Sequence, residues 1–278
     1  MMTTLDGKLV LVTGGSSGIG RAIAEEVINN GGSVVLLARK PEMLEEARNQ
    51  IEGKKTSDEQ RVFTIAADVT DYHHLKSTLI SFVDEHTLPD IIINSAGVAH
   101  PGKFTTMPLD IFHWMMDVNY FGTVNTLKIL VPLLQKRRSG AIVNISSVAG
   151  FIGVYGYTAY GASKFAVAGF TDALRSELKP YNIDVSIVFP PDTDTPQLEY
   201  EKKYKPFITS EIAGSAKLMD ATIVAREILK QVLKKKYLIL PGSEGKLLYF
   251  AHHLLGRSLY PVMDLMVKTS IQKIKFKK

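Results

Sequence analysis

The segment TGGSSGIG, residues 13–20, decides the fold class of this chain. It joins an apolar run, KLVLVTG at 8–14, to an amphipathic stretch at 21–30 that predicts a helix. Glycines at 14, 18 and 20 allow the backbone to turn sharply and to approach a pyrophosphate, which the N–H groups at a helix start attract. This strand–loop–helix unit predicts a Rossmann-type nucleotide site. A glycine-rich turn without a ligand is the alternative.

Six further apolar runs follow along the chain, at 33–39, 62–68, 90–97, 140–147, 183–190 and 236–242. Helix-like stretches lie between them, notably at 41–51, 109–135 and 158–180. Continuous apolar strands separated by helices are typical of a parallel sheet covered on both faces. We therefore predict a single doubly wound α/β domain with a seven-stranded parallel sheet over residues 1–242. A substrate cap is expected at about 192–220, and an amphipathic extension at 243–278.

The composition excludes several classes of protein. None of the 278 residues is cysteine, which rules out disulfides, thiolate metal sites and a cysteine nucleophile. Residues 1–201 hold 17 Lys and Arg against 23 Asp and Glu, whereas residues 202–278 hold 16 against 5. Such a basic tail favours an anionic partner. We expect no nucleic acid there, because no nucleic-acid module is recognisable. No apolar run reaches the roughly 18 residues of a membrane span.

The second predicted strand ends in Ala38-Arg39-Lys40, about 20 residues beyond the glycine loop. Sites that prefer NAD place a carboxylate here for the ribose 2′-hydroxyl, and a carboxylate repels a 2′-phosphate. A guanidinium binds that phosphate through two parallel hydrogen bonds. Arg39, with Lys40 as a second cation, therefore predicts NADPH as the cofactor. A solvated surface arginine is the alternative.

A tyrosine and a lysine four residues apart, Tyr160 and Lys164, occur in YGASK. On a helix their side chains share one face. A free tyrosine has a pKa of about 10, and a nearby ammonium lowers it. Upstream, the fifth apolar run ends in Ser146-Ser147, at the edge where parallel sheets present side chains to ligands. This combination predicts acid–base chemistry beside the nucleotide.

With these motifs, the chain resembles the short-chain dehydrogenase/reductase superfamily over about residues 5–242. The resemblance also includes NSAG at 94–97 and DVNYFG, which contains Asn119. It implies that Tyr160 is the general acid–base, and that Lys164 binds the nicotinamide ribose and lowers the tyrosine pKa. The family serine precedes the tyrosine by 13 positions, which selects Ser147 to polarise the substrate carbonyl. The family asparagine, here Asn119, holds a water in the proton relay.

The resemblance also completes the predicted cofactor site. It implies that Asn94 braces the central strand, that Asp68 contacts the adenine and that Thr195 approaches the nicotinamide amide. The predicted cofactor-binding residues are Gly14, Ser16, Ser17, Gly18, Ile19, Gly20, Arg39, Lys40, Asp68, Val69, Asn94, Ala96, Gly97, Tyr160, Lys164, Pro190, Thr193 and Thr195.

The run PPDTDTP at 190–196 narrows the resemblance, because most members follow the sixth strand with Pro-Gly. With GKF at 102–104, YTAY at 157–160 and SELKPYN at 176–182, it resembles the 3-ketodihydrosphingosine reductases. That implies NADPH-dependent reduction of a long-chain apolar ketone in a pocket formed by residues 99–103, 151–157 and 192–217. One alternative is reduction of a steroid, retinoid or 3-oxoacyl compound. Another is a nucleotide-sensing scaffold, which the intact catalytic set argues against.

The extension at 243–278 combines aliphatic and aromatic residues with flanking lysines, as an interfacial membrane helix does. Packing on the body or on a second subunit is the alternative. Eukaryotic members carry membrane-spanning segments, and none is convincing here. We therefore expect a cytoplasmic protein, or one peripheral on the cytoplasmic face of a membrane. The resemblance implies a homodimer or homotetramer. We expect no metal site, because the adjacent His252 and His253 do not share a helix face.

Overall fold

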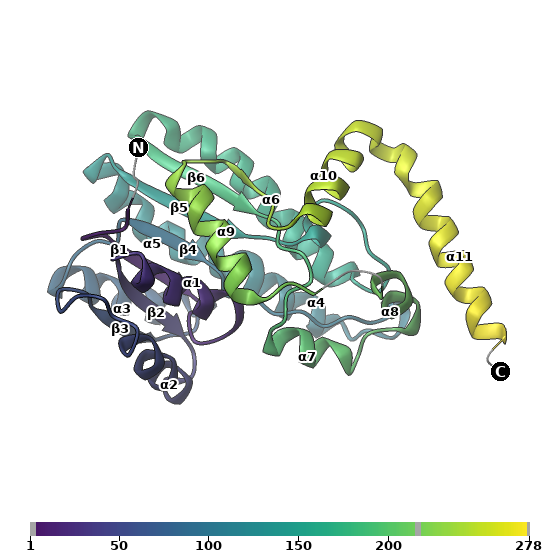
Figure 1. The fold of residues 1–278 in the computed structure, drawn as a ribbon, viewed down its shortest axis with the longest axis horizontal. Helices are drawn as coiled ribbons and strands as arrows, with labels where there is room; N and C mark the ends of the chain where they lie inside the picture. The colour runs from purple at the N-terminus through teal and green to yellow at the C-terminus, as the bar shows by residue number, and fades with distance from the viewer. Residues whose placement is uncertain (1–3, 215–217, 277–278) are drawn as a thin grey trace.

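The computed structural model describes residues 4–214 and 218–276 (Figure 1). A seven-stranded sheet lies at its centre, in the order β3-β2-β1-β4-β5-β6-β7, and each neighbouring pair is parallel. The strands are β1 (Leu9–Thr13), β2 (Ser33–Ala38), β3 (Val62–Ala66), β4 (Ile91–Asn94), β5 (Gly140–Ile145), β6 (Ile183–Val188) and β7 (Leu238–Ile239). The predicted doubly wound fold is therefore confirmed. Its strand order reverses between β1 and β4, where such sheets bind ligands at their carboxyl edge.

Alternating side chains along β1 supply both faces of the sheet with a core. Val10 and Val12 pack with α1 (Gly18–Asn29), α2 (Pro41–Glu52) and α9 (Ala221–Leu233). Leu9 and Leu11 pack on the opposite face, in a core that includes residues of three other helices. These helices are α3 (Tyr72–Glu85), α5 (Gly122–Arg137) and α6 (Thr158–Leu178). Because helices cover both faces, the strands are apolar throughout, as the sequence shows.

Most elements differ from their predicted bounds by a few residues, and some of these differences bear on the site. Helix α1 begins at Gly18, three residues before the amphipathic stretch at 21–30, so the glycine loop already contains its first turn. The helix predicted at 109–135 is α4 (Leu109–Met116), a π-helical turn at Asp117–Phe121 and α5. Strand β7 is short and covers only Leu238–Ile239 of the run predicted at 236–242; it pairs with Ile187 and Val188 at the end of β6.

The segment predicted as a cap contains two short helices, α7 (Pro196–Lys202) and α8 (Phe207–Ala213). A backbone bridge closes its base, because Asp194 N donates to Met219 O over 2.9 Å and Met219 N donates to Asp192 O over 3.1 Å. The segment therefore leaves the sheet after β6 and returns to it before α9. Residues 215–217 of this cap lie outside the described residues.

The extension folds as α10 (Ser243–Leu255), a 3₁₀ turn at Gly256–Leu259, and α11 (Tyr260–Phe276). Leu248, Tyr249, Leu259 and Met263 pack against an apolar cluster that includes Phe151. Figure 1 shows α11 (yellow) leaving the body beyond α10 and passing α8 (green). Lys273 of α11 pairs with Glu211 of α8 over 2.7 Å. Within residues 4–214 and 218–276, no helix is long and apolar enough to cross a bilayer.

Candidate active site

The loop after β1 is shaped for close approach of a ligand. Gly14 has a φ of +69°, and a Cβ there would lie 2.9 Å from the backbone of Ala96. A Cβ on Gly20 would lie 2.3 Å from the carbonyl oxygen of Gly14. Both positions therefore require glycine. The first turn of α1 has no acidic residue, and Ser17 makes no capping hydrogen bond through its side chain. The N–H groups there are thus available to an anion, so the loop fits a dinucleotide pyrophosphate.

The loop after β4 forms the neighbouring wall of the site. Thr13 Oγ1 accepts hydrogen bonds from Ser95 N and Ala96 N, both over 3.1 Å. Gly97 follows, and a Cβ there would lie 3.3 Å from Asn119 Oδ1 and 3.4 Å from Lys164 Nζ. The two loops therefore meet where the strand order reverses, and the second one passes close to the predicted catalytic side chains.

The residues predicted to contact the adenosine half lie at the rim. The Arg39 side chain is 54% exposed, and its Nη1 lies 3.9 Å from Asp68 Oδ2. Asp68 Oδ1 also accepts hydrogen bonds from the backbone and hydroxyl of Thr70, over 2.9 and 2.8 Å. Lys40 is exposed at the start of α2. Arg39 and Lys40 thus follow β2 with exposed side chains, and the Arg39 guanidinium pairs with Asp68 at a distance that leaves it accessible to a phosphate.

Helix α6 carries Tyr160 and Lys164 one turn apart, and both are buried, with exposures of 9% and 6%. Lys164 Nζ lies 5.7 Å from the centre of the Tyr160 ring and donates a hydrogen bond to Ile145 O over 3.1 Å. Ser146 Oγ donates to Lys164 O over 2.9 Å, so this serine holds α6 against β5. Ser147 instead hydrogen-bonds Tyr160. The structure thus separates the two serines by what each side chain contacts.

Asn119 lies in the π turn and is almost wholly buried. Its Oδ1 accepts from Val98 N over 2.8 Å, and its Nδ2 donates to Val98 O and to Ser163 Oγ over 3.0 and 2.8 Å. Ser163 in turn donates to Tyr160 O over 2.7 Å. Asn119 therefore ties the loop after β4 to the catalytic helix. Single π turns of this kind are frequent at functional sites.

A second buried chain of amides positions the same helix. Asn94 Nδ2 donates to Asn144 Oδ1 over 2.8 Å, across the register pair that joins β4 to β5. Asn144 Nδ2 donates to Thr171 Oγ1 over 2.9 Å, and Thr171 Oγ1 donates to Val167 O over 2.6 Å. The carboxyl ends of two strands are thereby fixed to α6, which keeps its catalytic face at the sheet edge.

Burial dominates the electrostatics of the site. It raises the pKa of Tyr160, the charge of Glu201 raises it further, and the hydrogen bond with Ser147 lowers it. Burial lowers the pKa of Lys164 to about 8, against an upward effect of Glu201. The pKa of Tyr160 is therefore raised in this structure, whereas the resemblance implies that Lys164 lowers it. A raised pKa keeps the phenol protonated at neutral pH, which is the form that donates a proton.

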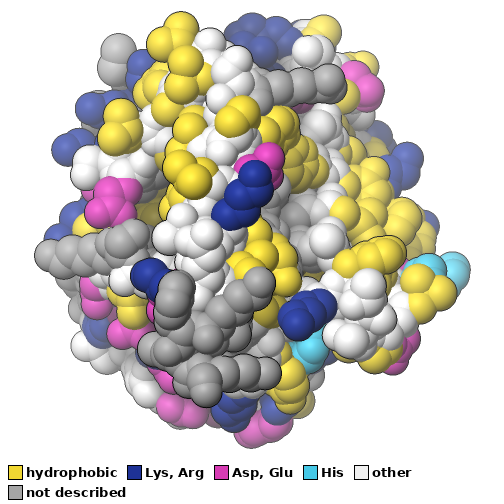
Figure 2. Space-filling view, turned by 90° about the vertical axis from the view of Figure 1, so that its right-hand side faces the viewer, with side chains coloured by type: hydrophobic (Ala, Val, Ile, Leu, Met, Phe, Trp, Pro, Cys, Tyr) yellow, Lys and Arg dark blue, Asp and Glu magenta, His cyan; other side chains and the backbone are white. Residues whose placement is uncertain are grey.

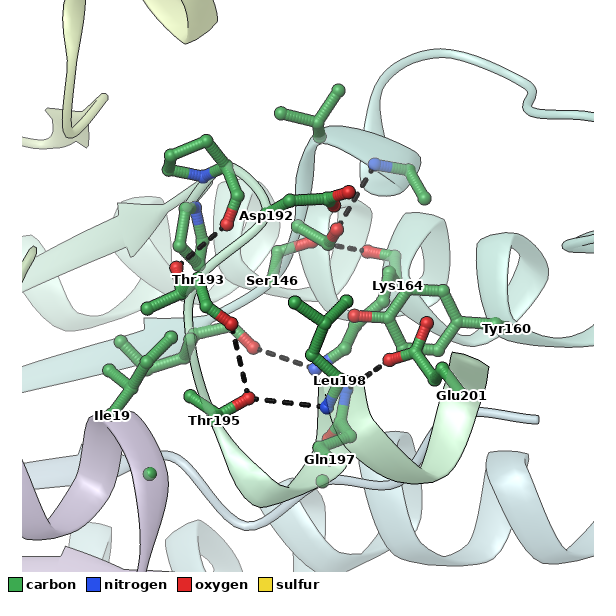
Figure 3. A pocket seen from close by; sticks show the side chains of 18 of the residues that line it. Ile19, Ser146, Tyr160, Lys164, Asp192, Thr193, Thr195, Gln197, Leu198 and Glu201 are labelled. Atoms are coloured by element: carbon green, nitrogen blue, oxygen red, sulfur yellow. Dashed lines mark hydrogen bonds between the residues drawn. The ribbon is translucent and has the colours of Figure 1, made fainter. Parts of the chain in front are cut away.

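A cavity of about 410 Å³ connects the glycine loop to the side chains of Ser147, Tyr160 and Lys164 (Figure 3). Of the predicted site residues, those lining it are Gly14, Ser17, Gly18, Ile19, Gly20, Gly97, Ser147, Tyr160, Lys164, Pro190, Thr193 and Thr195. The others lie outside the lining: Ser16, Arg39, Lys40, Asp68, Val69, Asn94, Ala96 and Asn119. Of these, Val69 is buried against Gly122, where a Cβ would lie 2.5 Å from its side chain.

Two of the three segments predicted to form the substrate pocket contribute residues to the lining of this cavity. Val154 and Tyr157 line it, as do residues of 192–212, but residues 100–103 line a separate cavity with Tyr204 and Pro206. The segment predicted at 99–103 is therefore not part of the lining of the main cavity. Lys217 lies outside the described residues. Within the predicted segment 192–217, the lining includes Asp192, Gln197, Leu198, Glu201 and Lys205. Glu244, Gly245 and Leu248 of the C-terminal extension also line the cavity, and the sequence did not predict them there.

Comparisons with known proteins identify the family to which this chain belongs. Residues 8–205 match the family model described as short chain dehydrogenase, and the chain belongs to this family of oxidoreductases. It is 38% identical to a 3-ketodihydrosphingosine reductase of Mus musculus, over 88% of this chain and 74% of the mouse protein. It is 39% identical to a 3-dehydrosphinganine reductase of Danio rerio, with the same coverage.

Solved structures of short-chain dehydrogenases and reductases have a similar fold. A short-chain dehydrogenase from Sphingobium yanoikuyae in complex with NADPH superposes with a TM-score of 0.77, at 26% identity over 91% of this chain and 95% of that one. A 3-oxoacyl-[acyl-carrier protein] reductase from Brucella melitensis gives 0.74, at 28% identity over 86% and 92%. Both neighbours thus share nearly the whole fold.

Proposed function

We propose that this protein is an NADPH-dependent ketone reductase that converts 3-ketodihydrosphingosine to dihydrosphingosine. The observation that carries the proposal is a single cavity lined by the glycine loop, Ser147, Tyr160 and Lys164. Relatives named for this substrate, at 36–39% identity, support it over other apolar carbonyls. The substrate class is thus drawn from the relatives, and the reaction type from the site.

NADPH supplies the hydride when it is bound. The glycine loop and the start of α1 fit its pyrophosphate, and the exposed Arg39, with Lys40 beside it, fits the 2′-phosphate. Asp68 lies near this position but already accepts two hydrogen bonds from Thr70, which leaves the guanidinium as the group facing outward. The cation at this position favours NADPH over NADH.

The chain's own residues supply the proton and hold the ketone. Ser147 binds the carbonyl oxygen and polarises the bond, and Tyr160 donates its phenolic proton to that oxygen. Lys164 binds the nicotinamide ribose and stabilises the phenolate that remains. Asn119 completes the path by which the phenolate regains a proton. The raised pKa of Tyr160 favours this direction, because the acid form is the one present before the reaction.

The walls of the cavity suit an apolar chain. Val154, Leu198, Ile212 and Leu248 bring aliphatic side chains from the loop after β5, from α7 and α8, and from α10. A cavity of this size, with apolar walls and a few polar groups at one end, is typical of a small-molecule site. Because Leu248 lies on α10, the C-terminal extension is itself part of the substrate site.

We also propose that α10 and α11 dock on an anionic bilayer. Leu248 faces the cavity, whereas Leu247, Phe250 and Leu254 on the same helix are 74%, 61% and 86% exposed. Large apolar side chains remain exposed on α11: Tyr260, Val262, Leu265, Met266 and Ile271. Figure 2 shows this side of the molecule, where hydrophobic side chains are interspersed with Lys and Arg.

The charges near these helices favour lipid as the occupant. Lys268 on α11 is exposed. Lys246 on α10 and Lys273 on α11 are exposed as well, although they also pair with Glu227 over 4.0 Å and with Glu211 over 2.7 Å. Each such lysine gains about 1 kcal/mol near an anionic leaflet. A lipid ketone would then pass from the bilayer along α10 to a cavity that the same helix lines. Removal of 243–278, or charged substitutions on this face, should abolish flotation with anionic liposomes.

We further propose a homodimer or homotetramer that pairs through α5 and α6. Phe121, immediately before α5, and Phe165, on α6, are 47% and 45% exposed, which leaves apolar surface there for a second copy. Light scattering of the purified protein tests this. A monomer at micromolar concentration contradicts it.

The assay that tests the function is NADPH oxidation with 3-ketodihydrosphingosine, a 3-oxoacyl thioester and a steroid ketone as parallel substrates. We expect turnover of the first with a much higher kcat/KM than of the other two. A preference for either of the others replaces the substrate assignment and leaves the reductase assignment in place.

A further inference from the structure

A buried carboxylate lies next to the catalytic tyrosine. Glu201, on α7, is only 6% exposed, yet it lines the cavity. Figure 3 shows Glu201 and Tyr160 close together in the cavity, and the charge of Glu201 raises the pKa of Tyr160. Proton transfer from Tyr160 to the ketone does not use this residue. Burying a carboxylate is unfavourable unless a charge or several donors compensate, so its place beside the reacting atoms needs an explanation.

Only neutral groups hydrogen-bond the Glu201 carboxylate. Tyr157 donates its hydroxyl to Oε2 over 2.5 Å, and Gln197 Nε2 donates to Oε1 over 3.0 Å. A carboxylate can accept about four hydrogen bonds, so acceptor capacity remains. Among residues 4–214 and 218–276, no Lys, Arg or His nitrogen forms an ion pair with it.

The other charged groups that line the cavity each have a cation, solvent or a backbone carbonyl as their partner. Asp192 Oδ2 lies 3.9 Å from Lys205 Nζ, so this carboxylate has a cation. Glu244 is exposed at the mouth of the cavity, where water solvates it. The Lys164 ammonium donates to Ile145 O, on the sheet side. Glu201 is thus a buried carboxylate of the cavity, and no cation of the described residues forms an ion pair with it.

The substrate of the proposed reaction carries a suitable cation. In 3-ketodihydrosphingosine, a primary amine sits on the carbon between the ketone and the terminal hydroxymethyl group. When Ser147 and Tyr160 hold the carbonyl oxygen, a group one carbon away lies within reach of the carboxylate beside Tyr160. We infer that Glu201 binds the ammonium of a 2-amino ketone and thereby selects this substrate; the inference rests on the proposed reductase function.

This assignment gives Glu201 two effects on the reaction. The ion pair fixes the orientation of the ketone, because ammonium and carbonyl lie on adjacent carbons and both are then held. It also rejects ketones of similar length without an amine, because they leave the buried carboxylate unpaired. Hydrogen bonds to charged groups of this kind change affinity by about 10- to 100-fold.

The test compares two ketones that differ only in the amine. Wild type, Glu201→Gln and Glu199→Gln are assayed with 3-ketodihydrosphingosine and with 1-hydroxyoctadecan-3-one, below the pH range where Lys164 titrates. Glu199 is the matched control, because it lies on the same helix with a 61% exposed side chain paired to Lys202. Glutamine keeps the size of Glu201 and removes its charge.

We expect wild type and Glu199→Gln to favour the amino ketone by about 30-fold in kcat/KM. Glu201→Gln should lose this preference, because its kcat/KM falls by about that factor more for the amino ketone than for 1-hydroxyoctadecan-3-one. Equal losses on both ketones would mean that Glu201 only supports Tyr157, and would overturn the inference. A preference that persists in Glu201→Gln overturns it as well.

A measurement on the wild type guards against a variant that does not fold. Hexadecylamine should inhibit reduction of 1-hydroxyoctadecan-3-one competitively, and hexadecanol should do so at least tenfold more weakly; equal inhibition contradicts an ammonium site. A failure of the proposed function would look different: wild type would reduce other ketones but not 3-ketodihydrosphingosine. Turnover of that substrate without amine discrimination leaves the function in place and removes the role of Glu201.

Discussion

Burial of the Lys164 ammonium predicts an unusual pH dependence. This side chain is 6% exposed, and its one hydrogen bond to the described protein is to the neutral Ile145 O, over 3.1 Å. Burial therefore lowers its pKa from 10.5 to about 8, although the charge of Glu201 opposes the shift. The ammonium then outnumbers the amine by about ten to one at about pH 7, and the ratio is reversed at about pH 9.

The expected consequence is a basic limb in the rate profile. With NADPH varied at saturating ketone, kcat/KM should fall about tenfold for each pH unit above about 8. Tyr160 does not produce this limb, because its pKa is raised. The assay uses 1-hydroxyoctadecan-3-one, which has no amine to titrate in the same range.

Two variants decide whether the limb belongs to Lys164. Glu201 raises the pKa of Lys164, so Glu201→Gln should move the limb to lower pH. Glu199→Gln, on the same helix but exposed, should leave it in place. A limb near the ordinary lysine value, or one that Glu201→Gln moves to higher pH, would refute burial as the controlling effect.

Separate parts of the structure give three further predictions. Arg39→Asp should shift the ratio of kcat/KM for NADPH and NADH towards NADH by at least tenfold; an unchanged ratio contradicts the assignment of the 2′-phosphate site. Lys164→Met should abolish turnover, yet raise the free energy of unfolding by about 1–3 kcal/mol at neutral pH. The reason is that a lysine with a lowered pKa destabilises the fold below about pH 8, and this penalty fades between about pH 8 and 10.5. Denaturant titration at two pH values measures the change, and a destabilised variant would contradict the prediction. The double variant Phe250→Glu, Leu254→Glu should lose flotation with anionic liposomes and keep NADPH binding, whereas retained flotation would place the membrane contact elsewhere.

The sequence predicts the nucleotide half of the site well because its constraints are local. TGGSSGIG requires glycine where a Cβ would meet backbone, and that requirement is visible in the letters alone. Tyr160 and Lys164 share a helix face through spacing alone. The seven parallel strands are equally visible, because burial on both faces makes each run apolar.

The substrate half depends on contacts between distant segments, which no local pattern encodes. Glu201 in the sequence EYEKKYK is typical of an exposed charged helix, yet the fold of 192–220 turns it onto Tyr157, 44 positions away. Leu248 and Leu247 are neighbours in the sequence, and only the packing of α10 shows that one lines the cavity and the other is exposed. The π turn at Asn119 is likewise invisible in a helical pattern that continues on both sides.

The most direct test of the account is a comparison of wild type with Tyr160→Phe. NADPH binding is measured by fluorescence, and turnover by NADPH oxidation with 3-ketodihydrosphingosine. The variant lacks the proton that the phenol supplies and keeps the glycine loop, Arg39 and Lys164. We predict unchanged NADPH affinity and a loss of turnover of at least 100-fold, within the range that general acid catalysis contributes. Turnover retained by Tyr160→Phe, or no turnover by the wild type, would contradict the account.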